Sequence, residues 1–319
     1  MGRVLVNGID KIPCLGVDTQ QNEGMVQYTS AMLLVDASVY IFRAFHSLPS
    51  SLTGRDEQPL NAVYGYTTFL VQLLAADDDP HVAAAFDESL TSSFRNQFFA
   101  DYKANRELPP AALEAQIGAC REITEALGVA TLSSRVYEAD DLIGTLAKDS
   151  DSPVTIVTSD KDLAQIMGPD DILWDYARET RYDCAAIEAK FGVPPARIAD
   201  YLALVGDTVD NIPGVPGIGA KTAASLLQQF DGIDALLGDL DGVAASGLRG
   251  AKSLAAKLEA HAEQVRLSYR LATIVTDIDL AGEQRDIRRR APDHEKLSSI
   301  CERLGVGERL RKRLGVATS

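Results

Sequence analysis

Short apolar runs alternate along the first half of the chain with longer segments whose apolar residues recur every three or four positions. The short runs are typical of buried strands, and the longer segments are typical of helices that pack on a sheet. We predict strands at 32–35, 82–86, 130–132, 154–159 and 172–174. We predict helices at 38–46, 62–75, 113–127 and 138–148. This alternation indicates an α/β fold with a central, parallel-rich sheet and flanking helices.

The pattern changes near residue 185, where helical spacing and tight turns replace the strand-like runs. A helix is predicted at 198–205, and another ends at Phe230 after a glycine-rich turn. We therefore expect an α/β core over 31–190 and a helical region over 191–319. Residues 1–30 lack periodicity, and we expect a loose extension there. Segment 88–112 is polar, basic and aromatic, which favours a mobile part of the core.

Composition places the chain among ordinary globular proteins. Its 319 residues exceed the usual size of one hydrophobic core, and the hydrophobic and charged fractions are 46% and 24%. No apolar run approaches the ~18 residues of a membrane helix, and no signal peptide is visible. The four cysteines are scattered, and no histidine or cysteine pair has zinc-ligand spacing. We expect a cytoplasmic monomer with reduced thiols and no membrane partner.

The formal net charge of −15 taken alone argues against a nucleic-acid partner. The charge is uneven, however, because basic residues gather at 285–313 and at 95–106. Many acidic residues, in contrast, stand at positions that suggest a metal site, where bound cations would reverse the local sign. A nucleic-acid partner therefore stays open.

Asp36, Asp87 and Asp160 each stand at the end of a predicted strand. The carboxyl ends of parallel strands line one crevice, so these side chains are expected to share a rim. Two carboxylates about 4 Å apart repel by ~4 kcal/mol at an effective dielectric constant near 20. Such a cluster needs either protonation or divalent cations, and we favour the cations at neutral pH.

Further acidic residues follow the same logic. Glu138, Asp140 and Asp141 begin a predicted helix; one acid there is explained by the helix dipole, at ~0.3–1 kcal/mol, but three exceed that need. Asp162 lies beside Asp160, where the alternative is an Asx turn. The pair Asp207 and Asp210 can point the same way, and a capping pair is the alternative.

Segment 88–112 carries Arg95, Tyr102, Lys103 and Arg106 directly after Asp87. Such a run is usually a solvated surface, but here it can reach over the acidic rim. The i, i+3 spacing of Lys103 and Arg106 would let them clamp a phosphate from one helical face. Tyr102 would stack on a base.

Gly214, Gly217 and Gly219 lead into the N-terminus of a helix that starts near Lys221 and Thr222. Glycines allow sharp turns and close approach, and free amides at a helix start hold phosphate. The turn does not follow a strand, so a dinucleotide fold is disfavoured. An ordinary helix hairpin is the alternative to binding of the DNA backbone.

Taken together, these segments resemble the bacterial 5′-nuclease family, which includes the 5′-nuclease domain of DNA polymerase I, flap endonucleases and phage 5′-exonucleases. The resemblance runs from about residue 33 to 237. The segments that carry it are Leu34-Val35-Asp36, Phe86-Asp87, Ser93-Phe94-Arg95, Tyr102-Lys103-Ala104-Asn105-Arg106, Tyr137-Glu138-Ala139-Asp140-Asp141, Thr158-Ser159-Asp160-Lys161-Asp162, Gly206-Asp207-Thr208-Val209-Asp210-Asn211 and the glycine turn.

The resemblance implies a PIN-like nuclease core, with 88–112 as its arch segment, and a helix–three-turn–helix at about 202–230 that binds DNA. It implies 5′–3′ exonuclease and 5′-flap endonuclease activity with two or more Mg²⁺ or Mn²⁺ ions. By position, the first metal site matches Asp36, Asp87, Glu138 and Asp140. The second site or its surroundings match Asp141, Asp160, Asp162, Asp207 and Asp210.

The candidate catalytic residues are then Lys103, Arg106 and Arg95 together with Asp36 and Asp140, and the partner is branched or nicked duplex DNA with a 5′ flap or 5′ end. The resemblance also allows a potassium ion on backbone carbonyls such as those of Val205, Val215 and Ile218. No polymerase or proofreading region is visible, so a stand-alone nuclease is expected. Two alternatives stay open: a DNA-structure-binding accessory protein with structural metals, and an RNA-cleaving nuclease.

Overall fold

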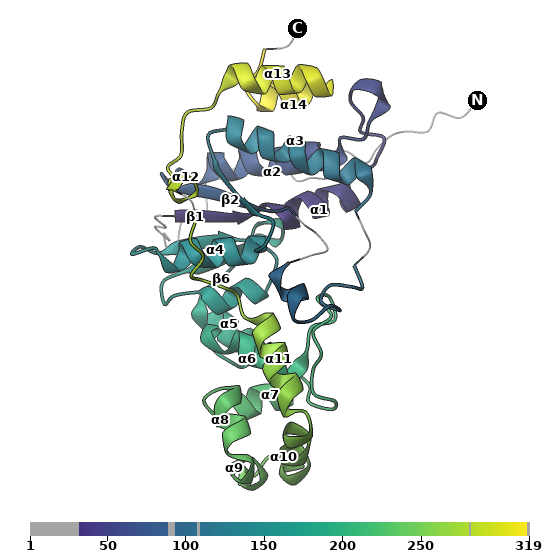
Figure 1. Cartoon of the computed structure of the whole chain (residues 1–319). Coiled ribbons are helices and arrows are strands. Elements are labelled where there is room, and N and C mark those ends of the chain that lie inside the picture. The colour runs from purple at the N-terminus through teal and green to yellow at the C-terminus, as the bar shows by residue number, and fades with distance from the viewer. Residues whose placement is uncertain (1–31, 89–92, 107–108, 281, 318–319) are drawn as a thin grey trace, which may run out of the picture.

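A six-stranded sheet forms the middle layer of the molecule (Figure 1). The computed structural model describes residues 32–88, 93–106, 109–280 and 282–317, so the extension expected over 1–30 lies outside the described residues. The strand order is β3-β2-β1-β4-β5-β6. The strands are β1 (Met32–Asp36), β2 (Val82–Asp87), β3 (Ala130–Ser134), β4 (Val154–Val157), β5 (Ile172–Asp175) and β6 (Thr180–Tyr182).

The order of the strands creates a crevice beside β1. The chain runs outward from β1 to β2 and β3, and then returns to pair β4 with the other edge of β1. Ligands of open parallel sheets bind at such a reversal, outside the carboxyl ends of the strands. Asp36 and Asp87 end β1 and β2, and Asp160 follows β4 by three residues.

The prediction of a parallel-rich sheet is confirmed, with one strand missed. β1 to β5 pair in parallel, whereas β6 pairs antiparallel with β5. β4 ends at Val157 rather than at 159, because Thr158 turns its hydroxyl group to Asp36. β6 has only three residues and carries no apolar run, so its residues show no strand pattern.

Helices cover both faces of the sheet, and β1 shows why. Leu33 and Val35 pack into one core and Leu34 packs into the other, as the period of two in a strand requires. The first core is covered by α1 and α2 with α3, and the second by α4. The helices of this part are α1 (Ala37–Ser47), α2 (Asn61–Ala76), α3 (Ala111–Ala126), α4 (Ala139–Lys148) and α5 (Cys184–Phe191).

The second part of the chain is helical, as predicted, and its helices α7 to α10 lie at the far end of the molecule from α13 (Figure 1). The predicted helix 198–205 is observed without change. No helix of the described residues is long and apolar enough to cross a membrane. The helices are α6 (Ile198–Val205), α7 (Ala220–Leu227), α8 (Ile233–Gly238), α9 (Leu240–Ala245), α10 (Ala251–Ala260), α11 (Ala262–Ala272), α12 (Gly282–Arg285), α13 (His294–Leu304) and α14 (Glu308–Arg313).

The last helices of the predicted helical region 191–319 lie apart from α7 to α10 (Figure 1). α13 packs against α3, and α14 packs against α2, on the side of the sheet away from α7 to α10 (Figure 1). Leu297, Ile300 and Leu310 are buried in the same core as Leu33 and Val35. The amphipathic spacing of these residues predicts helices, but it does not predict which part of the protein the helices pack against.

Candidate active site

Asp36 occupies the centre of the crevice. As the last residue of β1 it caps α1, accepting a hydrogen bond from the Val39 amide at 3.3 Å. Its other oxygen accepts from the Thr158 hydroxyl group at 2.9 Å. Burial, followed by the charges of Asp87 and Asp160, raises the pKa of Asp36 to about 7.

Asp87 and Asp140 lie close enough to Asp36 for the charges of the three carboxylates to interact. Asp87 joins the end of β2 to the start of α4, because its carboxylate accepts a hydrogen bond from the Ala139 amide at 2.9 Å. Burial raises the pKa of Asp87. Burial, and then the charges of Asp160, Asp36 and Asp87, raise the pKa of Asp140 well above its usual range. Carboxylates from separate elements thus repel one another along one rim, as the sequence predicted.

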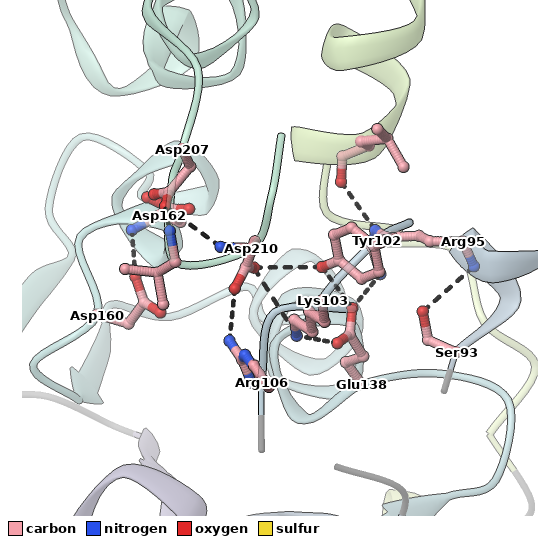
Figure 2. Close-up of polar contacts among 12 residues, drawn as sticks. Ser93, Arg95, Tyr102, Lys103, Arg106, Glu138, Asp160, Asp162, Asp207 and Asp210 are labelled. Atoms are coloured by element: carbon pink, nitrogen blue, oxygen red, sulfur yellow. Dashed lines mark hydrogen bonds and ion pairs between the residues drawn. The ribbon is translucent and has the colours of Figure 1, made fainter. Parts of the chain in front are cut away.

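Glu138 lies directly before α4, and its carboxylate is held by three donors (Figure 2). Oε2 accepts from Arg95 at 2.7 Å and from the Tyr102 hydroxyl group at 3.0 Å, and Oε1 pairs with Lys103. Glu138 and Asp141 also form a reciprocal capping box at the start of the helix. Capping, the alternative considered for these acids, is therefore part of their role.

Asp160, Asp162 and Asp207 form a second group beside the first (Figure 2). Asp160 accepts from the Asp162 amide at 2.9 Å, which is the Asx contact considered as an alternative. Burial and the charge of Asp160 raise the pKa of Asp162 to about 7. Its buried Oδ1 has no hydrogen-bond partner among the described residues, and Lys161 Nζ lies 3.5 Å away.

Asp207 differs from these neighbours in its charge state. It accepts from the Val209 amide at 2.7 Å and from Lys161 Nζ at 3.0 Å. Burial disfavours its charge, but the hydrogen bond and charge of Lys161 outweigh burial and lower the pKa of Asp207. Lys161 is a site residue that was not predicted, although its place between Asp160 and Asp162 was a signal.

Asp210 lies between the two groups (Figure 2) and meets the arch segment. It pairs with Arg106, and its other oxygen lies 3.3 Å from the Tyr102 hydroxyl group and 3.8 Å from Lys103 Nζ. The helical face expected for Lys103 and Arg106 is wrong: these residues lie in turns, and Lys103 has a φ of 57°. Both side chains nevertheless reach the acidic rim.

Two asparagines that were not predicted as site residues fasten the arch segment to the loop 207–212. Asn105 donates to the Thr208 carbonyl at 2.7 Å, and Asn211 donates to the Asp101 carbonyl at 2.6 Å. The Lys103 amide adds a bond to the Asp210 carbonyl at 3.0 Å. The described part of the arch at 93–106 is therefore hydrogen-bonded to this loop, and the mobility expected of the segment stays a prediction.

Arg95 and Tyr102 are buried, which corrects two expectations. Each is 3% exposed, so the Tyr102 ring offers no face on which a base could stack. The Arg95 guanidinium group donates its hydrogen bonds to Glu138, Asp141 and two main-chain carbonyls, so it is not free to bind a ligand at the rim. Neither side chain is placed to touch a substrate phosphate.

The carboxylates offer oxygen donors alone, which suits a hard divalent cation such as Mg²⁺ or Mn²⁺. In the described part of the chain, no three acidic, histidine or cysteine side chains close around one point as metal ligands. Several carboxylates pair instead with Lys103, Arg106 and Lys161. The mutual repulsion at Asp140 and the buried Oδ1 of Asp162, which accepts no hydrogen bond and has only the Lys161 ammonium group at 3.5 Å, nevertheless fit cations at this rim.

The glycine turn lies between α6 and α7, and its first glycine, Gly214, follows Asp210 by four residues. A Cβ atom on Gly214 would lie 2.2 Å from the Val205 carbonyl oxygen, and Gly217 has a φ of 79°. Gly219 caps α7 and has open space where a Cβ would stand, next to the exposed Lys221 and the half-buried Thr222. The turn therefore presents backbone and one cation to solvent.

The structure therefore defines a two-part protein in which a mostly parallel α/β core, with acids at the carboxyl ends of its strands, is joined to a small helical domain. The chain belongs to the 5′-3′ exonuclease family: residues 31–192 match its N-terminal resolvase-like domain, and residues 193–295 match its C-terminal SAM fold.

Curated relatives include DNA polymerase I of Pseudomonas aeruginosa, 43% identical over 277 residues, which cover 86% of this chain and 30% of that protein. The thermostable DNA polymerase I of Thermus aquaticus is 38% identical over 284 residues, which cover 88% of this chain and 33% of the relative. The chain thus spans about a third of the length of these polymerases.

Solved structures share the fold at low identity. A zinc-bound T5 5′-exonuclease has a TM-score of 0.61 at 19% identity and covers 90% of this chain and 99% of its own. The catalytic core of Rad2 in complex with DNA has a TM-score of 0.60 at 15% identity, covering 90% of this chain and 92% of its own. These matches confirm the predicted architecture.

Proposed function

We propose that this protein is a metal-dependent, structure-specific 5′-nuclease that hydrolyses DNA phosphodiesters at 5′ ends and 5′ flaps. The observation that carries the proposal is the set of mutually repelling carboxylates at the reversal of the sheet, with Lys103 and Arg106 beside them. Membership of the 5′-3′ exonuclease family supports it.

We infer that Asp36, Asp87, Glu138 and Asp140 hold one divalent ion. A second ion would be held by the remaining rim acids, Asp160, Asp162, Asp207 and Asp210. Asp141 has no free oxygen, because Arg95 and the amides of Glu138 and Val275 occupy both, so we assign it a structural role. Mg²⁺ or Mn²⁺ bound there would lower the pKa of a water molecule and stabilise the leaving oxygen.

Lys103 and Arg106 are the groups placed to bind the phosphate. The charges of Glu138 and Asp210 outweigh burial and raise the pKa of Lys103, so it stays cationic at neutral pH. Arg106 is likewise held by Asp210. When DNA enters, these cations would exchange a carboxylate partner for a phosphoryl oxygen and offset the charge that develops there.

The glycine turn and α7 are assigned to the duplex that flanks the cleavage site. Gly214, Gly217 and Gly219 let the backbone approach phosphates, and Lys221 and Thr222 add polar contacts. A potassium ion on the carbonyls of Val205, Val215 and Ile218 would strengthen that grip. The T5 flap endonuclease structure with DNA and the Rad2 structure with a DNA substrate support DNA as the partner.

The wild-type protein with a 5′-flap duplex, with and without Mn²⁺, tests the proposal. Cleavage near the flap junction that requires Mn²⁺ and is lost in Asp140→Asn is the expected result. Binding of the flap without cleavage under all divalent conditions would instead support an accessory protein. If a matched RNA flap is cut faster than the DNA flap, the preferred substrate is RNA and the proposed DNA substrate is wrong.

A further inference from the structure

Arg95 uses every hydrogen that its guanidinium group can donate. Nε donates to the Leu271 carbonyl at 2.8 Å, and Nη1 donates to Glu138 at 2.7 Å and to Asp141 at 2.8 Å. Nη2 donates to Asp141 and to the Thr273 carbonyl, each at 2.8 Å. Five N–H groups are the whole capacity of an arginine, and lysine has three.

The acceptors belong to two distant parts of the chain. Glu138 and Asp141 begin α4 at the acidic rim, whereas Leu271 and Thr273 lie at the C-terminal end of α11. The carbonyls at a helix C-terminus carry partial negative charge and lack partners within the helix, so a buried cation stabilises them. Figure 2 shows Arg95 between Glu138 and the end of this helix.

A second set of bonds closes the same junction. The Val275 amide donates to Asp141 at 2.9 Å, and the Ile274 amide donates to the Gln165 side chain at 2.9 Å. Gln165 in turn donates to the Ala272 carbonyl at 3.0 Å. The segment after α11 is therefore fixed to the nuclease core through side chains that adjoin the rim.

The same helix, α11, also holds the glycine turn, through residues that precede its C-terminal end. Gln264 donates to the Gly214 carbonyl at 2.7 Å, and Ser268 donates to the Pro213 carbonyl at 2.6 Å. α11 also packs along α6, which leads into that turn. A continuous set of hydrogen bonds thus runs from the glycine turn through α11 and Arg95 to the carboxylate of Glu138.

We propose that Arg95 is a positioning residue that orients Glu138 for metal binding and ties this orientation to the docking of α11. Arg95 and Tyr102 hold Oε2 of Glu138, which leaves Oε1 as the oxygen that meets Lys103 at the rim. The proposal rests on the metal-dependent function above. It excludes direct contact between Arg95 and the DNA.

The first test compares wild-type protein with Arg95→Lys, which keeps the charge but cannot supply five donors. Partners that orient a metal ligand typically contribute 10- to 100-fold to metal affinity, so Mn²⁺ binding measured by calorimetry without DNA should weaken by at least about 10-fold. At saturating flap DNA kcat should fall, while KM for the DNA stays within about 2-fold. High Mn²⁺ should restore part of kcat.

The control is Arg289→Lys, because Arg289 also donates to a main-chain carbonyl, that of Leu74 at 3.2 Å, outside the rim. It should match wild type in Mn²⁺ affinity and kcat. Unchanged Mn²⁺ affinity in a folded Arg95→Lys variant would overturn the proposal. A raised KM for DNA with unchanged kcat would do the same, since that result marks a phosphate contact.

The second test needs no variant and remains decisive if Arg95→Lys fails to fold. Amide hydrogen exchange of the wild-type protein is measured with and without Mn²⁺. We expect Mn²⁺ to slow exchange at 271–275 as well as at 138–141, because Arg95 connects Glu138 to the end of α11. Slowing at 138–141 alone would refute the coupling. No slowing at either segment would refute the metal site itself, and the coupling with it.

Discussion

Lys103 carries a positive charge into the most acidic part of the protein. Its ammonium group pairs with Glu138 and lies 3.8 Å from Asp210, with 13% of the side chain exposed. A cation in that place offsets the charge of the rim, and under the proposed function it would lie next to the phosphate of bound DNA. Loss of the Lys103 side chain should therefore lower the cleavage rate without weakening metal binding.

Replacing Lys103 by alanine tests this separation. Cleavage of a 5′-flap duplex should fall by about 10²–10³, the usual loss for one contact that stabilises the transition state. Mn²⁺ affinity should not weaken, because the substitution frees an oxygen of Glu138. Single-turnover rates and calorimetry measure the two effects, with the exposed Lys148→Ala on α4 as the control. Near-wild-type turnover would remove Lys103 from the mechanism.

The rim carboxylates predict an unusual pH dependence for the metal-free protein. Burial raises the folded-state pKa values of Asp36 and Asp162 to about 7 from an ordinary value of 3.8. The folded protein therefore holds these protons more tightly than the unfolded chain does. The resulting stabilisation is complete below about pH 4 and is lost as the pH rises to about 7. Over that range each of the two carboxyl groups lowers the free energy of unfolding by about 1.4 kcal/mol per pH unit.

Thermal unfolding in EDTA between pH 5 and 8 should show this loss, and Mn²⁺ should reverse it. Asp36→Asn mimics the protonated carboxyl group, so it should raise the melting temperature at pH 7.5 in EDTA and reduce the benefit of Mn²⁺, because it removes a ligand of the first of the two proposed ions. A melting temperature that rises steadily from pH 5 to 8 in EDTA would contradict the raised pKa values.

At this scale the apolar pattern located Asp36, Asp87 and Asp160 after strands and Glu138 and Asp140 at the start of a helix, and their shared metal site stays a prediction. Asp207 and Asp210 were proposed from their spacing alone, since they lie in the loop after α6. The sequence did not predict which cations pair with these acids. Arg95 and Arg106 stand in one basic segment, yet one is buried against α11 and the other reaches Asp210. The backbone conformation of the segment, which includes a positive φ at Lys103, determines which arginine is buried and which reaches Asp210.

Among the elements, the arch segment and the loop 207–212 behave as one unit in this structure. Asn105 and Asn211 bond across their junction, and Arg106 pairs with Asp210. Asparagine suits residue 211, because its φ is 56° and asparagine tolerates the left-handed region better than most residues. The junction places Lys103 above the rim.

Asn105→Ala should loosen this junction. Trypsin should then cut after Lys103 and Arg106 several-fold faster than in wild type, because proteolysis follows the population of the open segment. Flap cleavage should slow in parallel. Gln228→Ala is the matched control, since this amide also donates to a main-chain carbonyl, that of Gly192 at 3.0 Å, but in the helical domain. Equal digestion rates in all three proteins would show that the asparagine does not hold the arch.

The elements that the sequence predicted well are those buried on both faces. β1 and β2 are apolar up to their final aspartates, and β4 is apolar except for Thr155, because helices cover each side; such runs stand out in the chain. β6 is a half-exposed edge strand, and the turns at 99–106 have the spacing of a helix without its backbone. In both cases tertiary contacts, rather than local pattern, determine the conformation.

In the whole molecule, the last helices of the described chain pack against helices of the α/β core. After the helical domain the chain passes back along the sheet, and α13 and α14 complete the core around α2 and α3 (Figure 1). Leu297 has no exposed surface there, and Leu310 has 1%. The nuclease core therefore depends on residues more than 100 positions after its last strand, β6, which ends at Tyr182.

Leu297→Ala tests this dependence at a distance from the chemistry. Leucine-to-alanine changes at buried sites cost about 2–5 kcal/mol, so the free energy of unfolding should fall by that amount in urea. Mn²⁺ affinity and flap cleavage at low temperature should stay near wild type, because α13 lies on the face of the sheet opposite α4. The exposed Ser299→Ala on the same helix should change none of these quantities. A Leu297→Ala protein as stable as wild type would mean that α13 is not part of the core in solution.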